Sequence, residues 1–515
     1  MIDGTPFLKL YARKRGAELD RENAVEAQEQ QLLKLVRCAA NTRFGRDHDF
    51  ATIRTVADFQ ARVPLRRYED MWRDYWQPTF PRLTDCTWPG TISYFALSSG
   101  TTSGTTKYIP VSDDMNKSNS NGAKDMLVHH VRNRPHTKLL GGKNFMLGGS
   151  TDLTELAPGI YAGDLSGIVA ARLSAWSRPF VYPPREVALI ADWEKKIDVL
   201  AHGVLKEDIR SVAGTPSWVL LFFERLFALQ PERPRNLRAF FPHLEMVTHG
   251  GVNFAPYRPQ FEALLEGSHA ETREVYAASE GFIASADRCP GEGMRLAADN
   301  GNFFEFVPLS ELGNAKPTRH WVGNIELGVD YAIVVSSCAG LFGYVLGDTV
   351  RFVDRKPPRL LVTGRTSYSL SAFGEHLTGE EIEDAVGAAA KAIGAAIADF
   401  SVGSVFPDAS RSRGGHLYVV EFIGATPDAA QSKRFLDEID TVLSQCNDDY
   451  RAHRFGGFGL DPPLLKAVPR GTFEAWMKSR GQLGGQHKVP RVIANQDLFT
   501  SLQAFAAAPT ISNTQ

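Results

Sequence analysis

The sequence predicts an α/β protein in which a large, mixed N-terminal body is followed by a smaller C-terminal α+β domain. Its 515 residues exceed what one compact core holds, and 43% of them are hydrophobic, which is enough to bury more than one core. Strand-like runs alternate with helical stretches through most of the chain, whereas amphipathic helices flank a single strand after Gly364. We therefore expect one domain over residues 1–365 and a second over residues 366–515.

The N-terminal body is expected to alternate between helices and strands. Residues 21–37 carry apolar side chains at helical spacing and predict a surface helix. Residues 91–97, 301–309 and 330–337 are rich in β-branched and aromatic side chains and predict strands, and residues 218–229 predict a helix. This alternation indicates a large mixed α/β body.

The C-terminal region shows a different pattern. The segment "LTGEEIEDAVGAAAKAIGAA" places Ile382, Val386 and Ile393 on one face of a helix. "GHLYVVEFIG" reads as a strand, and "PDAAQSKRFLDEIDTVLSQC" as a second amphipathic helix. Helices that cover one sheet are typical of a small α+β domain.

The composition of the chain argues against several classes of protein. Lys and Arg number 57 against 59 Asp and Glu, so the chain has no overall basic charge for nucleic acid or an anionic membrane. The 5 cysteines are scattered without a Cys-x-x-Cys pair, which indicates neither a disulfide framework nor a thiolate zinc site. The first residues lack the apolar core of a signal peptide, and the apolar segment 218–229 is interrupted by Glu224 and Arg225. We expect a cytoplasmic protein without nucleic-acid or membrane partners.

The tract "FALSSGTTSGTTKYIPVS", residues 95–112, has the composition of a polar loop or of an anion cradle. It is not a Walker A loop, because Lys107 adjoins neither Gly100 nor Gly104 and Tyr108 stands where a magnesium-binding hydroxyl is required. We expect a turn between a strand and a helix that starts near Ser112, where backbone amides and hydroxyls can wrap phosphates. An ordinary polar loop remains the alternative.

Two further segments have residue types suited to a nucleotide. In "HGGVNFAP", residues 249–256, the glycines let a flat ring approach the backbone closely, although a plain turn is the simpler interpretation. In "EVYAASEGFIA", Tyr276 can stack on a base, while Ser279 and Glu280 can hold a phosphate oxygen and a divalent metal. A strand end with a buried tyrosine is the alternative for this segment.

Three charged residues complete the set. The segment "GLFGYVLGDTVRF" is strand-like around Gly347 and Asp348, and a carboxylate at a Gly-Asp turn can accept both hydroxyls of a ribose. "LVTGRTSYSL" contains Arg365 at the proposed domain boundary. "GQHKVPRV" places Lys488 in a loop bounded by glycine and proline, where a solvated surface lysine is the alternative.

Taken in order, these segments resemble the adenylate-forming superfamily, which includes acyl-CoA synthetases, nonribosomal peptide adenylation domains and luciferases. The wording of "SSGTTSGTTKYIPVS", "YAASEG", "GLFGYVLGDTV" and "GGQHKVPR" is similar to one branch, the auxin-responsive acyl acid amido synthetases of plants and their bacterial relatives. Weaker matches extend the resemblance from about Asn41 to about Val492. The chain departs from the family's "GLYRYR-GD" wording by lacking its two arginines, and has Ala278 where plant members often have serine.

The resemblance implies an enzyme that uses ATP and Mg²⁺ to convert a carboxylic acid into its acyl-AMP, which the amine of an amino acid then attacks to form an amide and release AMP. It implies that Lys488 and Glu280 are catalytic, Glu280 also being near the metal. The implied nucleotide-binding residues are Ser98, Ser99, Gly100, Thr101, Lys107 and Ser279 for the phosphates, Gly250, Gly251 and Tyr276 for the adenine, and Asp348 with Arg365 for the ribose.

An apolar acyl pocket is expected beside these residues, with Gly281, Phe282 and Trp218 as its candidate floor; for Trp218 a place in the core is the alternative. Two other functions stay open. The first is an acyl-CoA or carrier-protein ligase, against which the C-terminal region lacks the Gly-Lys signature of those enzymes. The second is a non-catalytic nucleotide-binding protein that has kept the fold.

Overall fold

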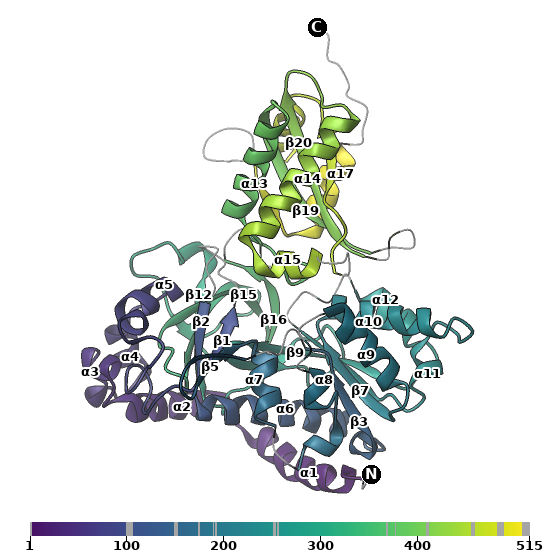
Figure 1. Ribbon diagram of the computed structural model, residues 1–515. Coiled ribbons are helices and arrows are strands. Elements are labelled where there is room, and N and C mark those ends of the chain that lie inside the picture. Colours follow the sequence, from purple (N-terminus) through teal and green to yellow (C-terminus); the bar gives the residue numbers. More distant parts are fainter. Residues whose placement is uncertain are drawn as a thin grey trace. The chain divides into compact units, whose positions relative to one another are not determined.

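The computed structural model describes residues 3–98, 107–148, 153–173, 176–188, 190, 193–250, 254, 257–366, 369–375, 377–407, 411, 413–454, 459–480 and 489–506. By its internal contacts the chain divides into two compact units, and the break follows Thr366 (Figure 1). We refer to them as the large unit and the small unit.

The large unit is built on a twelve-stranded mixed sheet. Its strands, in spatial order, are β13 (His320–Trp321), β12 (Asn302–Pro308), β14 (Asp330–Ser337), β15 (Tyr344–Arg355), β16 (Pro358–Arg365), β11 (Met294–Leu296), β10 (Gly281–Ser285), β9 (Glu271–Ala278), β8 (Met246–Gly250), β7 (Ile209–Gly214), β3 (Lys143–Met146) and β6 (Val181–Tyr182). The strands from β9 to β6 run parallel, and every other neighbouring pair is antiparallel. A second sheet has the order β2 (Lys107–Val111), β1 (Tyr94–Ser98), β5 (Ile160–Gly163) and β4 (Thr154–Ala157).

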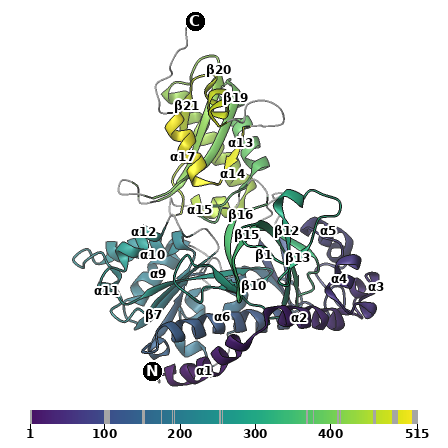
Figure 2. The same ribbon diagram turned by 180° about the vertical axis from the view of Figure 1, so that it is seen from behind.

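Helices pack around these sheets. They are α1 (Thr5–Arg21), α2 (Ala24–Ala39), α3 (Arg43–Asp47), α4 (Val56–Arg62), α5 (Tyr68–Met71), α6 (Asp113–Asn133), α7 (Leu165–Ala171), α8 (Arg185–Ala188), α9 (Trp193–Val204), α10 (Pro216–Leu229), α11 (Leu237–Phe240) and α12 (Arg258–Leu264). Figures 1 and 2 show α1, α2 and α6 along one side of the large sheet, where α6 lies against β10 and α2 against β12. Among the described residues, no helix is both long and apolar enough to cross a membrane.

The predicted helix over residues 21–37 begins later than expected. Helix α1, which we did not predict, ends at Arg21, and Glu22 is extended. Asn23 then caps α2, because its side chain accepts a hydrogen bond from the Val25 amide. An amphipathic pattern does not reveal such a break, since two helices joined by a cap keep the same apolar spacing.

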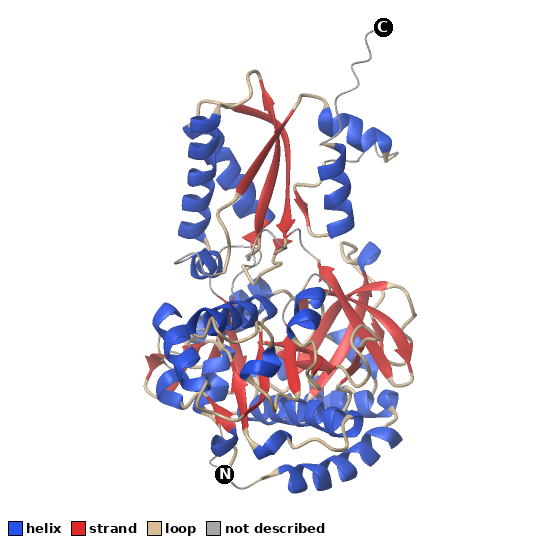
Figure 3. Cartoon of the chain, turned by 90° about the vertical axis from the view of Figure 1, so that its right-hand side faces the viewer, coloured by secondary structure: helices blue, strands red, loops and turns tan. Residues whose placement is uncertain are grey.

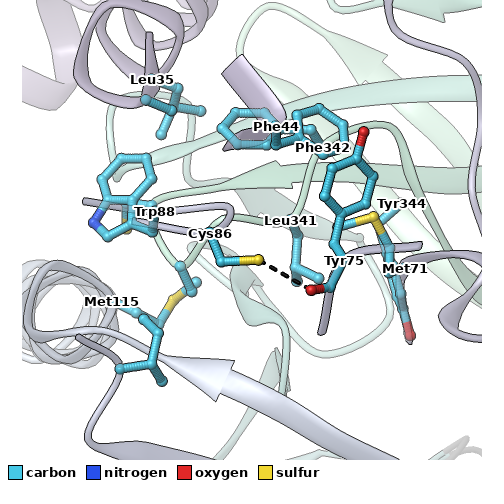
Figure 4. Packing of buried hydrophobic residues seen from close by; sticks show 14 of the residues in the cluster. Leu35, Phe44, Met71, Tyr75, Cys86, Trp88, Met115, Leu341, Phe342 and Tyr344 are labelled. Carbon is cyan, nitrogen blue, oxygen red and sulfur yellow. Dashed lines mark hydrogen bonds between the residues drawn. The ribbon is translucent and has the colours of Figure 1, made fainter. Parts of the chain in front are cut away.

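One apolar cluster anchors the start of β15. The ring of Phe342 lies 5.2 Å from that of Phe44 of α3, centroid to centroid, and Figure 4 shows both among the side chains of the cluster. Close by, the Cys86 thiol donates a hydrogen bond to the Tyr75 carbonyl oxygen at 3.2 Å. This packing fixes the segment before β15. Strand β15 itself contributes Tyr344 and Asp348 to the candidate site.

The small unit has a four-stranded sheet covered by helices on both faces. The strand order is β21 (Leu464–Val468), β20 (Gly415–Ile423), β19 (Ala396–Val405) and β22 (Val492–Ile493). Phe422 packs against Phe435 on one face, whereas Val419 packs with Trp476 and Phe499 on the other. The remaining elements are β17 (Ser369–Leu370), β18 (Leu377–Thr378), α13 (Gly379–Ala392), α14 (Ala429–Cys446), α15 (Asp448–Arg454), α16 (Thr472–Ser479) and α17 (Gln496–Phe505), and Figure 3 shows helices on either side of the sheet. The predicted fold class is confirmed, including the strand and both helices expected here.

Candidate active site

The hydroxyl of Tyr276 donates a hydrogen bond to Asp348, with 2.7 Å between the phenolic oxygen and Oδ2. Tyr276 lies on β9 and Asp348 on β15, and these strands are four positions apart in the sheet order. In a flat sheet that separation would be about 19 Å, more than two side chains can span. The sheet is therefore strongly curved here, and its inner face holds one apolar cluster that includes Tyr276, Ile283 and Val350.

Asp348 reaches this position through a bulge. Ala332 pairs with Thr349, but Val334 pairs with Val345, so residues 346–348 face a single residue of β14. Gly347 has a φ of 98°, which favours glycine over residues with a side chain. The expected strand character of this segment is thus confirmed, whereas the expected turn at the Gly-Asp pair is wrong. The Gly-Asp pair lies within a strand, and the bulge turns its side chains out of the regular alternation.

A second tyrosine holds the second carboxylate. Tyr344 of β15 is buried, and it interacts with Glu280, which lies in the tight turn between β9 and β10. Burial raises the pKa of Tyr344 well above its usual value, and the negative charge of Glu280 raises it further. Tyr344 therefore stays protonated and acts as a donor throughout the physiological range.

The two tyrosine–carboxylate bonds are reciprocal. The Tyr276 hydroxyl of the β9–β10 hairpin donates a hydrogen bond to the Asp348 carboxylate of β15, and the Tyr344 hydroxyl of β15 interacts with the Glu280 carboxylate of the hairpin. We name this set of four residues, Tyr276, Glu280, Tyr344 and Asp348, the tyrosine–carboxylate square. Neither carboxylate is neutralised by its tyrosine, because a phenol donates a hydrogen bond without carrying charge.

Ser98 and Lys107 face each other across two strands. They are paired residues of β1 and β2, so the hydroxyl-rich tract joins two antiparallel strands. The expectation that it leads directly into a helix is wrong, although α6 does follow, capped by Ser112 at its first turn. The Lys107 ammonium lies 5.3 Å from the ring centroid of Tyr68, a cation–π contact.

Tyr68 links this lysine to the square. Its hydroxyl accepts a hydrogen bond from the Tyr108 amide at 3.0 Å, and burial raises its pKa to about 12. Tyr68 and Tyr344 are both buried in the apolar cluster that anchors the start of β15. Sequence reasoning missed Tyr68 and Tyr344. Tyr344 stands in the "GLFGYVLGD" motif, so the motif itself was the available signal.

The remaining candidates differ in how they are placed. Gly250 ends β8, and a side-chain carbon there would come 2.2 Å from the Val275 carbonyl oxygen, so the close approach to β9 requires glycine. The Phe282 ring packs on Gly122 of α6, where an added side-chain carbon would lie 2.3 Å from that ring. Gly281 follows Glu280 at the start of β10, while Trp218 is half-buried in the first turn of α10.

The structure describes the other predicted residues only in part. Ser279 lies in the turn before Glu280, and Arg365 pairs with Asp348 in the β15–β16 ladder, but the side chain of Arg365 is not described. Ser99, Gly100, Thr101, Gly251 and Lys488 lie outside the described residues.

Three family models match the chain in succession. The GH3 family N-terminal domain matches residues 13–270, the central domain residues 295–365 and the C-terminal domain residues 380–497. Among curated proteins, the chain is 25% identical to the indole-3-acetic acid-amido synthetase GH3.3 of Arabidopsis thaliana over 268 residues, which are 49% of this chain and 43% of that protein. It is 29% identical to the jasmonoyl--L-amino acid synthetase JAR4 of Nicotiana attenuata over 43% of this chain and 40% of that one. The matches thus span less than half the length of these relatives.

Solved structures show the same fold over nearly the whole chain. The acyl acid amido synthetase AtGH3.15 in complex with 2,4-DB gives a TM-score of 0.61 at 19% identity, covering 97% of this chain and 96% of that one. A 2-hydroxyisobutyryl-CoA ligase in its thioesterification state gives 0.58 at 16% identity, covering 95% and 92%. The family resemblance of the motifs is confirmed, and the chain belongs to the GH3 family.

Proposed function

We propose that this protein is an ATP-dependent ligase that adenylates a carboxylic acid and transfers the acyl group to an amine, with an amino acid as the acceptor. The observation that carries the proposal is the tyrosine–carboxylate square, which brings the motif residues Tyr276, Glu280 and Asp348 together within a GH3 chain. The names of GH3 relatives, which are synthetases that conjugate acids with amino acids, support the choice of acceptor.

Asp348 and Tyr276 would hold the nucleoside. Asp348 keeps one carboxylate oxygen on the Tyr276 hydroxyl, and a carboxylate has further acceptor sites for ribose hydroxyls. Tyr276 would stack on the adenine, with Gly250 and Gly251 letting the ring approach the backbone of β8. Arg365 would support the ribose from the neighbouring strand.

The phosphates would meet the β1–β2 connection. Ser98, Ser99, Gly100 and Thr101 would bind them through amides and hydroxyls, with Lys107 at the β- and γ-phosphates and Ser279 at the α-phosphate. Lys488 would stabilise the charge that develops as the carboxylate attacks the α-phosphate, a step that forms the acyl-AMP and releases pyrophosphate.

Mg²⁺ fits the donors present. Among the described residues no group of three or more His, Cys, Asp or Glu side chains could hold a metal alone. Mg²⁺ is usually bound by one or two carboxylates together with substrate phosphates, and Glu280 offers such a carboxylate, oriented by Tyr344. When bound, Mg²⁺ offsets negative charge on the phosphates.

The domain roles follow the same proposal. Residues 1–365 would bind ATP and the acyl acid, with Gly281, Phe282 and Trp218 near the acyl chain, and residues 366–515 would form the lid that carries Lys488. The five cysteines are free, which suits the reducing cytoplasm, and the substrates would be small molecules rather than nucleic acid or membrane.

An acyl-CoA ligase is the second candidate, because the CoA ligase noted above matches this chain as well as some amido synthetases do. Pyrophosphate exchange across a panel of carboxylic acids, followed by product analysis with amino acids and with coenzyme A, separates the two. We expect amide and AMP. If only thioester forms, the protein is a CoA ligase.

Pyrophosphate exchange also tests the third possibility, a nucleotide-binding protein that has no catalytic activity. Asp348→Ala and Lys488→Ala should each lower exchange by at least a hundredfold. Asp437→Asn, which removes an exposed carboxylate from α14, should leave it unchanged. If no acid supports exchange, or if Lys488→Ala retains full activity, the catalytic proposal fails.

A further inference from the structure

The large unit contains a cavity of about 1240 Å³ that shares no residue with the candidate active site. We name it the corner cavity, because its wall includes the corner between α1 and α2. Its lining residues come from five stretches, 19–25, 129–133, 287–295, 322–327 and 354–359. Small-molecule sites usually measure about 300–1,000 Å³, so this volume admits an organic ligand.

The lining of the cavity is positively charged, although the whole chain has a net charge of -2. Six cationic side chains line it against four carboxylates, and the cations are Arg132, Arg288, Arg295, Arg355, Lys356 and Arg359. An excess of positive charge in a recess attracts anions, because low-dielectric walls focus the field.

The inner part of this lining is fixed by buried ion pairs. Arg359 donates two hydrogen bonds to Asp287, at 2.8 and 2.7 Å, and a third to Asp354 at 2.7 Å. Arg295 donates to Glu22 at 3.0 Å and to the Leu19 carbonyl oxygen at 2.6 Å. Both arginines are more than nine-tenths buried. These pairs hold the walls in place, but most of their charge is already balanced.

Two groups in the interior retain hydrogen-bonding capacity. Nε of Arg295 and Oε1 of Glu22 have no partner among the residues that the structure describes. His129 is 4% exposed, and burial lowers its pKa to about 3, so its imidazole is neutral at physiological pH. The interior is therefore polar without being saturated.

The unbalanced charge lies at the rim. Arg355, the last residue of β15, and Lys356, in the turn that follows, are exposed, and neither forms an ion pair with a described residue. Arg288 is also largely exposed and lies 3.6 Å from Asp354, at the long end of ion-pair distances. A ligand's anionic group would meet these cations first.

Another part of the rim is apolar. Val25 of α2 is 37% exposed and Leu327 is 52% exposed, and both line the cavity beside the largely buried Leu19 and Val322. Large aliphatic side chains exposed in a recess favour an apolar ligand surface.

We propose that the corner cavity binds an amphiphilic organic anion, with a carboxylate or phosphate group at Arg355 and Lys356 and an apolar body against Val25 and Leu327. This site is separate from the nucleotide site, and it does not depend on the proposed function. Arginine forks match both carboxylate and phosphate, so the two headgroups share the recognition chemistry.

Calorimetry on the full chain with four probes tests the site. The probes are 1-naphthyl phosphate, 1-naphthoate, the uncharged 1-naphthol and inorganic phosphate, at low ionic strength and with AMP present to fill the nucleotide site. We expect at least one naphthyl anion to bind at a single site, at least tenfold more tightly than naphthol or inorganic phosphate. The tighter of the two anions identifies the headgroup.

Variants locate the bound anion. Arg355→Ser with Lys356→Ser should weaken binding at least tenfold, and both side chains are exposed, so folding is preserved. Lys34→Ser with Arg37→Ser removes two exposed charges from α2 outside the cavity and should change nothing. Asp348→Ala should also leave binding intact. The proposal is overturned if neither anion binds, if the rim variant binds as well as the wild type, or if Asp348→Ala abolishes binding.

Discussion

Replacing Tyr276 with phenylalanine tests whether the tyrosine–carboxylate square prepares the nucleotide site. The change removes the hydroxyl that lies 2.7 Å from Asp348 and keeps the ring that would stack on adenine. A hydrogen bond to a charged group contributes about 1.5–3 kcal/mol, and each 1.4 kcal/mol is a factor of ten in affinity. Asp348 is half-buried, so water can replace the lost donor, and the smaller value applies. We expect AMP to bind about tenfold more weakly.

Calorimetric titration with AMP measures this effect, and Tyr331→Phe is the matched control. Tyr331 belongs to the same apolar cluster, and its hydroxyl accepts a hydrogen bond from the Glu326 amide at 3.0 Å without touching either carboxylate. The control should therefore lose stability but not AMP affinity. If Tyr276→Phe binds AMP within twofold of the wild type, or if Tyr331→Phe loses as much affinity, the hydroxyl does not orient Asp348.

Three further outcomes are expected. Tyr344→Phe should raise the Mg²⁺ concentration for half-maximal pyrophosphate exchange about tenfold, because the carboxylate of the β9–β10 turn loses a charged hydrogen bond of about 1.5–3 kcal/mol; an unchanged Mg²⁺ midpoint would refute that role. Gly250→Ala should destabilise the chain by about 1–3 kcal/mol in urea unfolding, whereas Gly387→Ala, which meets nothing within 4 Å, should not. Burial would raise the pKa of Glu271, but hydrogen bonding to His130 brings it to about 2, below the usual 4.5. Ionised Glu271 should therefore add up to about 3 kcal/mol to the free energy of unfolding. This contribution should be complete above pH 4.5 and should decrease as the pH falls towards 2. The free energy of unfolding of Glu271→Gln should therefore fall less between pH 4.5 and pH 2 than that of the wild type. An identical pH profile for the two proteins would contradict this role of Glu271.

The sequence identified several residues of the candidate site, but it did not predict the contacts between their side chains. The motifs identified Tyr276, Glu280 and Asp348, because each combines a residue type and neighbours typical of nucleotide sites. The hydrogen bond between Tyr276 and Asp348 joins residues that are 72 positions apart in the sequence, and it depends on the curvature of the sheet. Curvature arises from many strand contacts at once, so no local pattern predicts it.

The errors share a physical cause. Gly347 and Asp348 have the composition of a turn, yet β14 pairs with Val345 and Thr349 on either side of them and β16 pairs with Asp348. These pairings keep the two residues in a strand, where the positive φ of Gly347 appears as a bulge. The hydroxyl-rich tract likewise has the composition of a strand–helix connection, but residues 107–111 pair with β1 first. Tertiary pairing overrides local composition in both places.

Under the proposed function, the square would let two carboxylates serve a polyanionic substrate. Beside a triphosphate, Glu280 and Asp348 would add negative charge, and pairing them with arginine would remove that repulsion. It would also occupy the oxygens that a ribose or Mg²⁺ needs, since a bidentate arginine engages both oxygens of a carboxylate. A hydrogen bond from a tyrosine hydroxyl, such as that from Tyr276 to Asp348, neither neutralises a carboxylate nor occupies more than one of its acceptor sites. The family's "GLYRYR-GD" arginines are absent from this chain, where Phe342 to Leu346 are uncharged. Under the proposed function, the charge of a bound nucleotide would then be offset by Mg²⁺ and by lysines such as Lys107 and Lys488, so the catalytic proposal requires both.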